Sequence, residues 1–380
     1  MKHFYFACLT IFSLTISIQA QGESSLVDVG GYNMHFNIIN GEGVPILFEA
    51  GGGNDSSVWA PILESIYNVT GTTLITYDRS GFGKSELNPY LKKETDFGIE
   101  NGIKELKIGL TKLGYDGQII LVSHSYGGLY NMLYARKYPE KVISVVSIDA
   151  TPSEFWNEEL LSMRDMNVDI TTIPKPSGDY YMNYNYNATM RYIRGMKFPE
   201  NIPVTNIFPE NSFPDFPEIL STRWRTLQEE LGDKNENIHN VIAKNSGHAV
   251  FQDNPTLIIN SVIKAYAKTL DKNQQINLLP KVLNNAIDLS IQSKYNNRTA
   301  HDLNTLGYSL MANQDMDNAL VLFKAATLLF PHNANAYDSY GEALLAVNKT
   351  EEAIKMYEKS IELNPENDHG KSILEELKRK

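Results

Sequence analysis

Short apolar runs alternate with stretches of helical spacing between residues 44 and 270, and this alternation limits the possible folds more than any other feature. Short apolar runs are typical of buried strands, and apolar residues three and four apart are typical of helices. The alternation therefore predicts an α/β fold with a mostly parallel sheet and helices on both of its faces. The predicted strands are 44–50, 72–78, 118–124, 141–149, 202–208 and 237–243, with helices at 96–113 and 255–270.

Residues 151–200 do not follow the alternation, and we predict that they form a lid over the carboxyl ends of the strands. They contain Trp156 and several tyrosines, among them Tyr181 and Tyr186. As a group above a site, these side chains favour a partly apolar or aromatic substrate. Each tyrosine by itself is better explained by packing of the insertion onto the body.

The N-terminal residues 1–20 have the pattern of an export signal. Lys2 provides a positive charge, residues 4–18 are apolar, and Ala20 is a small residue at a suitable cleavage point. The apolar part is short for a membrane span of about 20 residues, so we favour removal of the segment over a retained anchor. The mature protein is therefore expected to be exported, to the periplasm or the extracellular space, without a membrane span.

Charge and cysteine content exclude several classes of partner and site. The chain has 34 lysine and arginine residues against 45 acidic residues, a net charge of −11, and such a surface repels the phosphates of nucleic acids. The single cysteine, Cys8, excludes an intrachain disulfide and a cysteine-rich zinc site. The sequence shows no metal-binding cluster, phosphate loop or dinucleotide fingerprint, so we expect no metal and no cofactor.

The segment SHSYG at 123–127 predicts a nucleophilic serine. It lies between the apolar strand at 118–124 and the glycine-rich start of a helix, where a sharp turn exposes the middle serine. Small residues two positions before and after that serine let the chain make the turn, and Ser123 takes the place of the more usual glycine. Ser125 is therefore the candidate nucleophile.

The glycine run after the strand at 44–50 predicts one half of an oxyanion hole. Gly51, Gly52 and Gly53 present bare backbone at the end of this strand, where an N–H group can bind a developing negative charge. The residue after the nucleophile supplies the second donor in such sites. We assign the two donors to Gly52 and Tyr126.

His248 is the candidate general base. It ends the segment NSGH at 245–248, after the strand at 237–243 and before the helix at 255–270. A histidine at this position can take the proton of Ser125 and return it to the leaving group.

The segments YDRSGFGKS, SHSYGG and NSGH together resemble those of the α/β-hydrolase fold superfamily, of the serine-nucleophile type that includes esterases and peptidases. The resemblance covers about residues 24–270. Ala50 and Gly51 replace the His-Gly pair common in the family, which leaves the backbone donor possible. Asp78 and Arg79 are expected to brace a turn near the site by charge-assisted bonds. The serine excludes relatives with an aspartate nucleophile, such as epoxide hydrolases and haloalkane dehalogenases.

The resemblance also implies a carboxylate that follows the sixth or the seventh strand and completes the set with Ser125 and His248. Such a group holds the histidine in the required tautomer and stabilises the imidazolium. Asp149 ends one apolar strand sharply, whereas Glu210 lies in a less regular loop after the next strand. We favour Asp149, with Glu210 as the alternative acid; a cap of the following turn is the competing role for Asp149.

Two segments near the C-terminus match each other at an offset of 34 residues, with Gly307 corresponding to Gly341. These segments, at about 300–333 and 334–367, resemble tetratricopeptide repeats, in which each unit is a helix pair. Such arrays usually bind peptides or other proteins. Packing on the hydrolase domain or a dimer contact is an equal alternative, because two repeats form only a small groove.

The predicted chain thus has three parts: the export signal at 1–20, an α/β-hydrolase domain at 21–272 with its lid at about 151–200, and an all-helical repeat domain at 273–380. We expect an exported serine hydrolase that cleaves an ester, a lactone or a small amide or peptide bond through an acyl-enzyme intermediate. Its substrate would be a small molecule or a peptide. The alternative is a non-catalytic, hydrolase-like binding protein whose repeats recruit a protein partner.

Overall fold

The computed structural model describes residues 22–233 and 235–379, so the predicted export signal lies outside the described residues. The chain forms two compact units that divide between Leu278 and Leu279, inside the long helix α9 (Lys272–Tyr295). The boundary predicted from the sequence, between residues 272 and 273, lies where this helix begins. Within the described ranges, no helix is long and apolar enough to cross a membrane.

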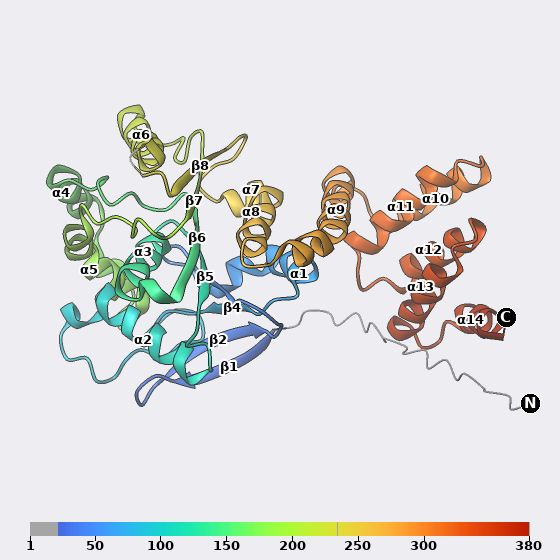
Figure 1. The fold of residues 1–380 in the computed structure, drawn as a ribbon, viewed down its shortest axis with the longest axis horizontal. Coiled ribbons are helices and arrows are strands. Elements are labelled where there is room, and N and C mark those ends of the chain that lie inside the picture. Colours follow the sequence, from blue (N-terminus) through green and yellow to red (C-terminus); the bar gives the residue numbers. More distant parts are fainter. Residues whose placement is uncertain (1–21, 234, 380) are drawn as a thin grey trace, which may run out of the picture. The chain divides into compact units, whose positions relative to one another are not determined.

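An eight-stranded sheet forms the centre of the first unit, in the order β1-β2-β4-β3-β5-β6-β7-β8 (Figure 1). β2 is antiparallel to both β1 and β4, and every other neighbouring pair is parallel. The predicted mostly parallel α/β sheet is therefore confirmed. The strands are β1 (Glu23–Asp28), β2 (Asn33–Ile39), β3 (Ile46–Glu49), β4 (Leu74–Tyr77), β5 (Ile119–His124), β6 (Val142–Ile148), β7 (Val204–Pro209) and β8 (Ile238–Ala243).

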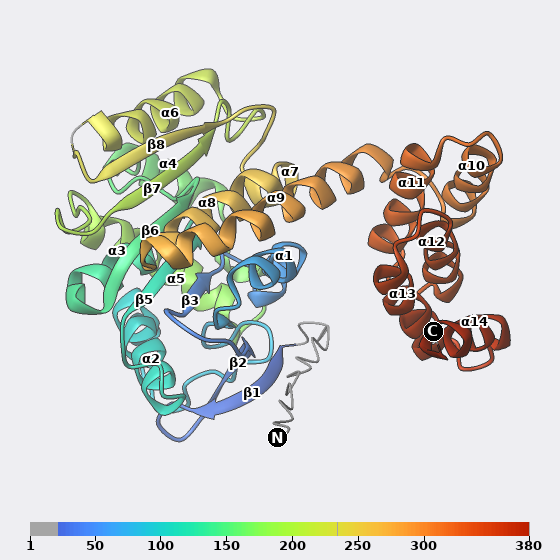
Figure 2. The ribbon, with the colours of Figure 1, turned by 45° about the vertical axis from the view of Figure 1, so that its right-hand side comes forward.

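Helices cover both faces of this sheet, as the alternation predicted. On helix α2 (Ile99–Lys112), apolar residues recur three and four positions apart. These residues, Ile103, Leu106 and Leu110, are buried in the core between the sheet and its helices. Helices α2 and α3 lie on one face and helices α1 and α8 on the other (Figure 2). Their bounds are α1 (Ala60–Thr70), α2 (Ile99–Lys112), α3 (Gly127–Lys137) and α8 (Pro255–Ala267).

The segment predicted as a lid lies between β6 and β7 and contains two helices, α4 (Glu158–Asn167) and α5 (Gly178–Ile193). A further helix, α6 (Glu218–Asp233), connects β7 to β8 and was not anticipated from the sequence. The short helix α7 (Val250–Asp253) precedes α8. Short 3₁₀ turns occur at η1 (Ser56–Trp59), η2 (Glu94–Phe97), η3 (Pro139–Lys141) and η4 (Ile170–Thr172).

The second unit consists of helix pairs, as the 34-residue offset predicted. In each pair a glycine of the first helix lies against an aromatic ring of the second. A Cβ atom would lie 2.7 Å from Phe323 if placed on Gly307, and 3.0 Å from Tyr357 if placed on Gly341. The repeated glycine thus marks the close crossing of each pair. The pairs are α10 (Ala300–Ala312) with α11 (Met316–Leu329) and α12 (Ala334–Ala346) with α13 (Thr350–Leu363), followed by α14 (Asp368–Arg379).

Candidate active site

Ser125 lies on the sharp turn between β5 and α3. Its φ angle is +53°, in the left-handed region that non-glycine residues seldom adopt, and its side chain is partly exposed. Two glycines make the turn possible. A Cβ atom on Gly127 would collide with the carbonyl oxygen of Ala50, and one on Gly128 would collide with the side chain of Ala150. The turn predicted around the serine is therefore present.

Three of the residues named from the sequence form a hydrogen-bonded chain. Nε2 of His248 lies 2.9 Å from Oγ of Ser125, and Nδ1 of the same ring lies 2.7 Å from Oδ2 of Asp149. When Nδ1–H donates to the carboxylate, Nε2 is left to accept a hydrogen bond from the serine hydroxyl. The three residues follow β5, β8 and β6, so they meet at the carboxyl ends of parallel strands.

Burial and contacts distinguish the two candidate acids. Asp149 is completely buried, and its carboxylate bonds Nδ1 of His248. Glu210 is exposed in the loop after β7. Oδ1 of Asp149 accepts hydrogen bonds from Oγ of Ser212 at 3.0 Å, Nε1 of Trp224 at 2.8 Å and Nε2 of Gln228 at 3.3 Å. These three donors were not predicted from the sequence. Two of them lie four residues apart on α6, the helix that was also missed.

The predicted oxyanion donors lie beside each other. A Cβ atom on Gly52 would lie 3.4 Å from Cβ of Tyr126, the residue that follows the candidate nucleophile. In the described part of the chain no acceptor takes the backbone N–H of either residue. Both N–H groups are therefore available to a ligand at Ser125.

Arg79 holds the glycine loop in place. Its Nη1 donates to Oε1 of Glu49 and to the carbonyl oxygen of Ala50, both at 2.9 Å, and its Nη2 donates to that of Gly51 at 2.6 Å. The expected brace is present, but its carboxylate is Glu49 rather than Asp78, because Glu49 ends the strand from which the loop begins. Both side chains of this ion pair are buried, and burial raises the pKa of Glu49 to about 7 although Arg79 opposes the shift.

His124, which the sequence analysis did not assign, contacts the loop of the candidate base. Its Nε2–H donates to the carbonyl oxygen of His248 at 2.9 Å, and the two ring centroids lie 4.6 Å apart. Burial, and secondarily the neighbouring His248, lower the pKa of His124 to about 3, so the ring is neutral at ordinary pH. A sequence feature that could have indicated this role is the position of His124, which ends a buried strand directly before the candidate nucleophile.

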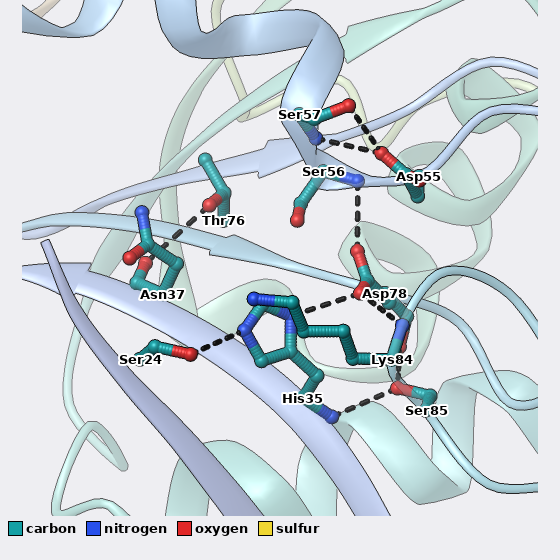
Figure 3. A network of polar contacts seen from close by, with 10 residues as sticks. All are labelled: Ser24, His35, Asn37, Asp55, Ser56, Ser57, Thr76, Asp78, Lys84 and Ser85. Atoms are coloured by element: carbon teal, nitrogen blue, oxygen red, sulfur yellow. Dashed lines mark hydrogen bonds and ion pairs between the residues drawn. The ribbon is translucent and has the colours of Figure 1, made fainter.

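Asp78, which directly follows β4, is the centre of a second polar network (Figure 3). Its Oδ1 accepts from the backbone N–H of Ser56 at 2.8 Å, and its Oδ2 accepts from that of Lys84 at 2.9 Å. Oδ2 also lies 2.8 Å from Nδ1 of His35, whose Nε2 lies 2.8 Å from Oγ of Ser24. This carboxylate therefore ties two loops and two strands together, which is a scaffold role.

The lid helix α5 covers the proposed oxyanion loop. Sδ of Met182 would lie 3.5 Å from a Cβ atom on Gly52, and the ring of Tyr186 stacks on that of Tyr126 with centroids 5.8 Å apart. A cavity of about 40 Å³ lies between lid and body beside Tyr126, and Tyr181 is one of its walls. Helix α5 of the segment predicted as a lid therefore lies over this loop, and Tyr181 lines the cavity while Tyr186 packs on Tyr126.

Within residues 22–233 and 235–379, no cluster of three or more His, Cys, Asp or Glu side chains is arranged to hold a metal ion.

Family models match both units. Residues 44–167 match one described as the alpha/beta hydrolase fold, and residues 310–377 match one described as the tetratricopeptide repeat.

Two curated bacterial proteins are similar over part of their length. The uncharacterized protein YqjL of Bacillus subtilis is 36% identical over 107 residues, which is 28% of this chain and 40% of that protein. A proline iminopeptidase of Lactobacillus delbrueckii subsp. bulgaricus is 32% identical over 118 residues, which is 30% of this chain and 39% of that protein. The chain thus spans about two fifths of the length of these relatives.

A crystal structure of an epoxide hydrolase, VrEH1, from Vigna radiata has a similar fold. It has 16% sequence identity and a TM-score of 0.50, and the match covers 66% of this chain and 99% of that chain. At this identity the likeness establishes the fold alone.

Proposed function

The chain joins an α/β-hydrolase domain to C-terminal tetratricopeptide repeats, and we propose that it is a serine hydrolase that cleaves an ester, a lactone or a small amide or peptide bond. The observation that carries the proposal is the hydrogen-bonded chain from Ser125 through His248 to Asp149. It lies beside two backbone N–H groups and beneath a lid. A serine at this position favours acyl transfer over the chemistry of relatives that use an aspartate nucleophile.

In the first half of the proposed reaction, Oγ of Ser125 attacks the carbonyl carbon while Nε2 of His248 takes its proton. The N–H groups of Gly52 and Tyr126 bind the negative charge that develops on the carbonyl oxygen. The buried carboxylate of Asp149 stabilises the imidazolium. The bond to the leaving group then breaks, and the leaving group takes the proton from the histidine.

In the second half, water replaces the leaving group. His248 removes a proton from this water, which attacks the carbonyl carbon of the acyl-enzyme. The acid product departs and Ser125 regains its proton, so the site returns to its starting state. The buried set of donors around Asp149 keeps the histidine oriented through both halves.

The cavity of about 40 Å³ beside Tyr126 is lined by neither Ser125 nor His248, so we do not assign it to the substrate. The proline iminopeptidase relative is the reason to include peptide bonds among the candidates.

The test is labelling of the purified protein with a fluorophosphonate probe, with the adduct located by peptide mass spectrometry. We expect a single adduct at Ser125 that is absent from Ser125→Ala. Absence of an adduct from correctly folded protein, or equal labelling of the variant, would contradict the proposal. A positive result would be followed by a comparison of small esters, lactones and amides as substrates.

The proposal includes export. The pattern of residues 1–20 supports removal of the segment after Ala20 and release of the remainder to the periplasm or the extracellular space. N-terminal sequencing of the protein from its native source is expected to begin at Gln21. A membrane-bound chain that retains Lys2 would show that the segment is an anchor.

The repeats are proposed to bind a protein partner, as arrays of this family commonly do. Sedimentation of the purified protein separates this from the alternative of a dimer contact: a monomer supports a role in binding other proteins, and a dimer lost on substitution within α10–α13 contradicts it.

A further inference from the structure

A cavity of about 420 Å³ lies close to the candidate acid, and neither Ser125 nor His248 lines it. Its walls come from α3, from the segment that follows Asp149, from the end of the lid and from α6. The apolar walls include Leu129, Met132, Phe198, Leu227, Leu231 and Ile238. A volume in the range of roughly 300–1,000 Å³ with mostly apolar walls is typical of sites for small ligands.

One helix connects this cavity to the candidate acid. Trp224 and Gln228 of α6 donate to Oδ1 of Asp149, while Leu227 and Leu231 of the same helix line the cavity. Each pair is four residues apart, so the two pairs form adjacent stripes on the helix. Any shift of α6 therefore changes both the cavity and the donors of the carboxylate.

A second connection runs through the chain next to the acid. Ala150 lines the cavity, and its carbonyl oxygen accepts a hydrogen bond from Nε2 of Gln228 at 2.7 Å. The same Nε2 lies 3.3 Å from Oδ1 of Asp149. A single amide group thus bridges the cavity wall and the carboxylate.

The walls and the charged groups define the kind of ligand. The apolar walls suit an aliphatic chain, because burial of its surface provides the driving force for binding. The charged residues that line the cavity are Glu154, Glu230 and Lys197, so the lining carries a net negative charge that disfavours an anionic ligand. The O–H of Ser153 donates to the carbonyl oxygen of Met196, and Oδ1 of Asn235 accepts from the backbone N–H of Asn237. The Ser153 oxygen can still accept a hydrogen bond from an uncharged polar head, and the Asn235 NH₂ group can donate one.

We propose that this cavity binds an uncharged aliphatic molecule, such as a medium-chain alcohol, and that its occupation holds α6 in place and increases the reactivity of Ser125. A ligand packed against Leu227 and Leu231 adds contacts that an empty cavity lacks, and so restrains the helix that positions Asp149. The effect on reactivity rests on the proposed function, whereas binding itself does not.

The experiment measures binding and reactivity with one probe, 1-octanol. Binding is followed by calorimetry on the Ser125→Ala protein, where no reaction can occur. Reactivity is followed as the rate of fluorophosphonate labelling of the wild-type protein with and without 1-octanol. We expect one molecule of 1-octanol to bind per chain and the labelling rate to rise at least threefold. Octanoate, with its charged head, is expected to bind at least tenfold more weakly.

Two substitutions fill the cavity, so that a folding defect in one leaves the other informative. Leu231→Phe and Phe198→Trp are each expected to weaken binding of 1-octanol at least tenfold. Ile219→Phe is the matched control, because Ile219 is 77% exposed on the same helix and does not line the cavity. We expect this control to bind 1-octanol like the wild-type protein.

The outcomes distinguish the two proposals. Unchanged binding in both cavity-filling variants, or a labelling rate that 1-octanol lowers, would overturn the inference, since the ligand would then lie elsewhere or compete at the active site. Binding with no labelling of Ser125 under any condition would contradict the proposed function and leave the binding site standing. Binding with an unaltered labelling rate would overturn the coupling through α6.

Discussion

Two hydrogen-bonded chains of serine, histidine and aspartate lie in the described part of the first unit. One is the proposed catalytic chain that begins at Ser125, and the other is formed by Ser24, His35 and Asp78 (Figure 3). In the Ser125 chain the histidine lies 2.9 Å from the serine oxygen and 2.7 Å from the carboxylate. In the Ser24 chain both distances are 2.8 Å. Distances alone do not distinguish the two.

Their surroundings do distinguish them. Ser125 lies on a turn with a φ angle of +53°, beside the N–H groups assigned to the oxyanion hole. Ser24 lies within the extended edge strand β1, paired with Asn37. Asp78 also accepts two backbone N–H groups from separate loops. The comparison teaches that a nucleophile requires the turn and the donors around it, whereas the same hydrogen bonds in a strand stabilise the fold.

The largest expected effect separates the two serines. Ser125→Ala should lower turnover by about 10⁶-fold, because the proposed nucleophile is lost. Ser24→Ala should leave turnover within about twofold of the wild-type value. Steady-state rates on an activated ester provide the measurement. A comparable loss in Ser24→Ala would show that the second chain takes part in the chemistry.

The second largest effect on turnover is expected to separate the two candidate acids, Asp149 and Glu210. Asp149→Asn should reduce kcat by about 10⁴-fold with the fold retained, because the histidine loses the partner that sets its tautomer. Glu210→Gln should have no such effect, since Glu210 is exposed. Circular dichroism confirms folding of both variants. A loss of rate in Glu210→Gln alone would return the acid role to the loop after β7.

Asp78→Asn is expected to change stability rather than rate. The buried carboxylate accepts from two backbone N–H groups and bonds His35, so its loss should lower the free energy of unfolding by about 3 kcal/mol. Urea denaturation measures this change. A variant of wild-type stability with greatly reduced turnover would reverse the distinction between the two chains.

The buried His124 should make the protein less stable in acid. Burial holds its pKa at about 3 against 6.5 for the unperturbed group, so the unfolded chain binds a proton there at a pH where the native state does not. The contribution of the neutral His124 to the free energy of unfolding is therefore fully present above pH 6.5, and it is lost as the pH falls towards 3.

His124→Phe should remove this part of the pH dependence. His239→Phe, at an exposed position on β8, serves as the matched control and should keep it. Urea denaturation at pH 4.5 and pH 7 compares the two variants with the wild type. An identical pH dependence in His124→Phe and the wild-type protein would contradict this account.

The smallest effect is expected from the loss of the Ser24 hydroxyl. Ser24 is exposed, so Ser24→Ala should lower the free energy of unfolding by about 1 kcal/mol or less. Denaturation beside Asp78→Asn provides the measurement. A loss as large as that of Asp78→Asn would mean that the serine, rather than the carboxylate, holds this network together.

Much of the fold and part of the site could be predicted from the sequence because their signals are local. The apolar run at 118–124, the small residues around Ser125 and the loop of His248 are all read from neighbours in the chain. Backbone geometry and burial periodicity make such patterns informative. The repeats could also be predicted, because the glycine and the aromatic residue of each helix crossing lie within the same repeat.

The partners of the buried charges could not be predicted in this way. Arg79 binds Glu49, thirty residues earlier in the chain, although Asp78 is its immediate neighbour. Trp224 and Gln228 reach the candidate acid from a helix that the sequence pattern did not reveal.

The sequence by itself determined the α/β architecture and pointed to the candidate nucleophile and the candidate base, because strand and helix periodicity and the requirements of a tight turn act over a few residues. Only the tertiary structure showed that Asp149, and not Glu210, bonds the candidate base, and only it showed which groups hold that carboxylate. The physical reason is that a buried charge is stable only where packing brings hydrogen-bond donors to it from distant segments of the chain. The whole core brings those segments together, and the residues next to the charge do not specify them.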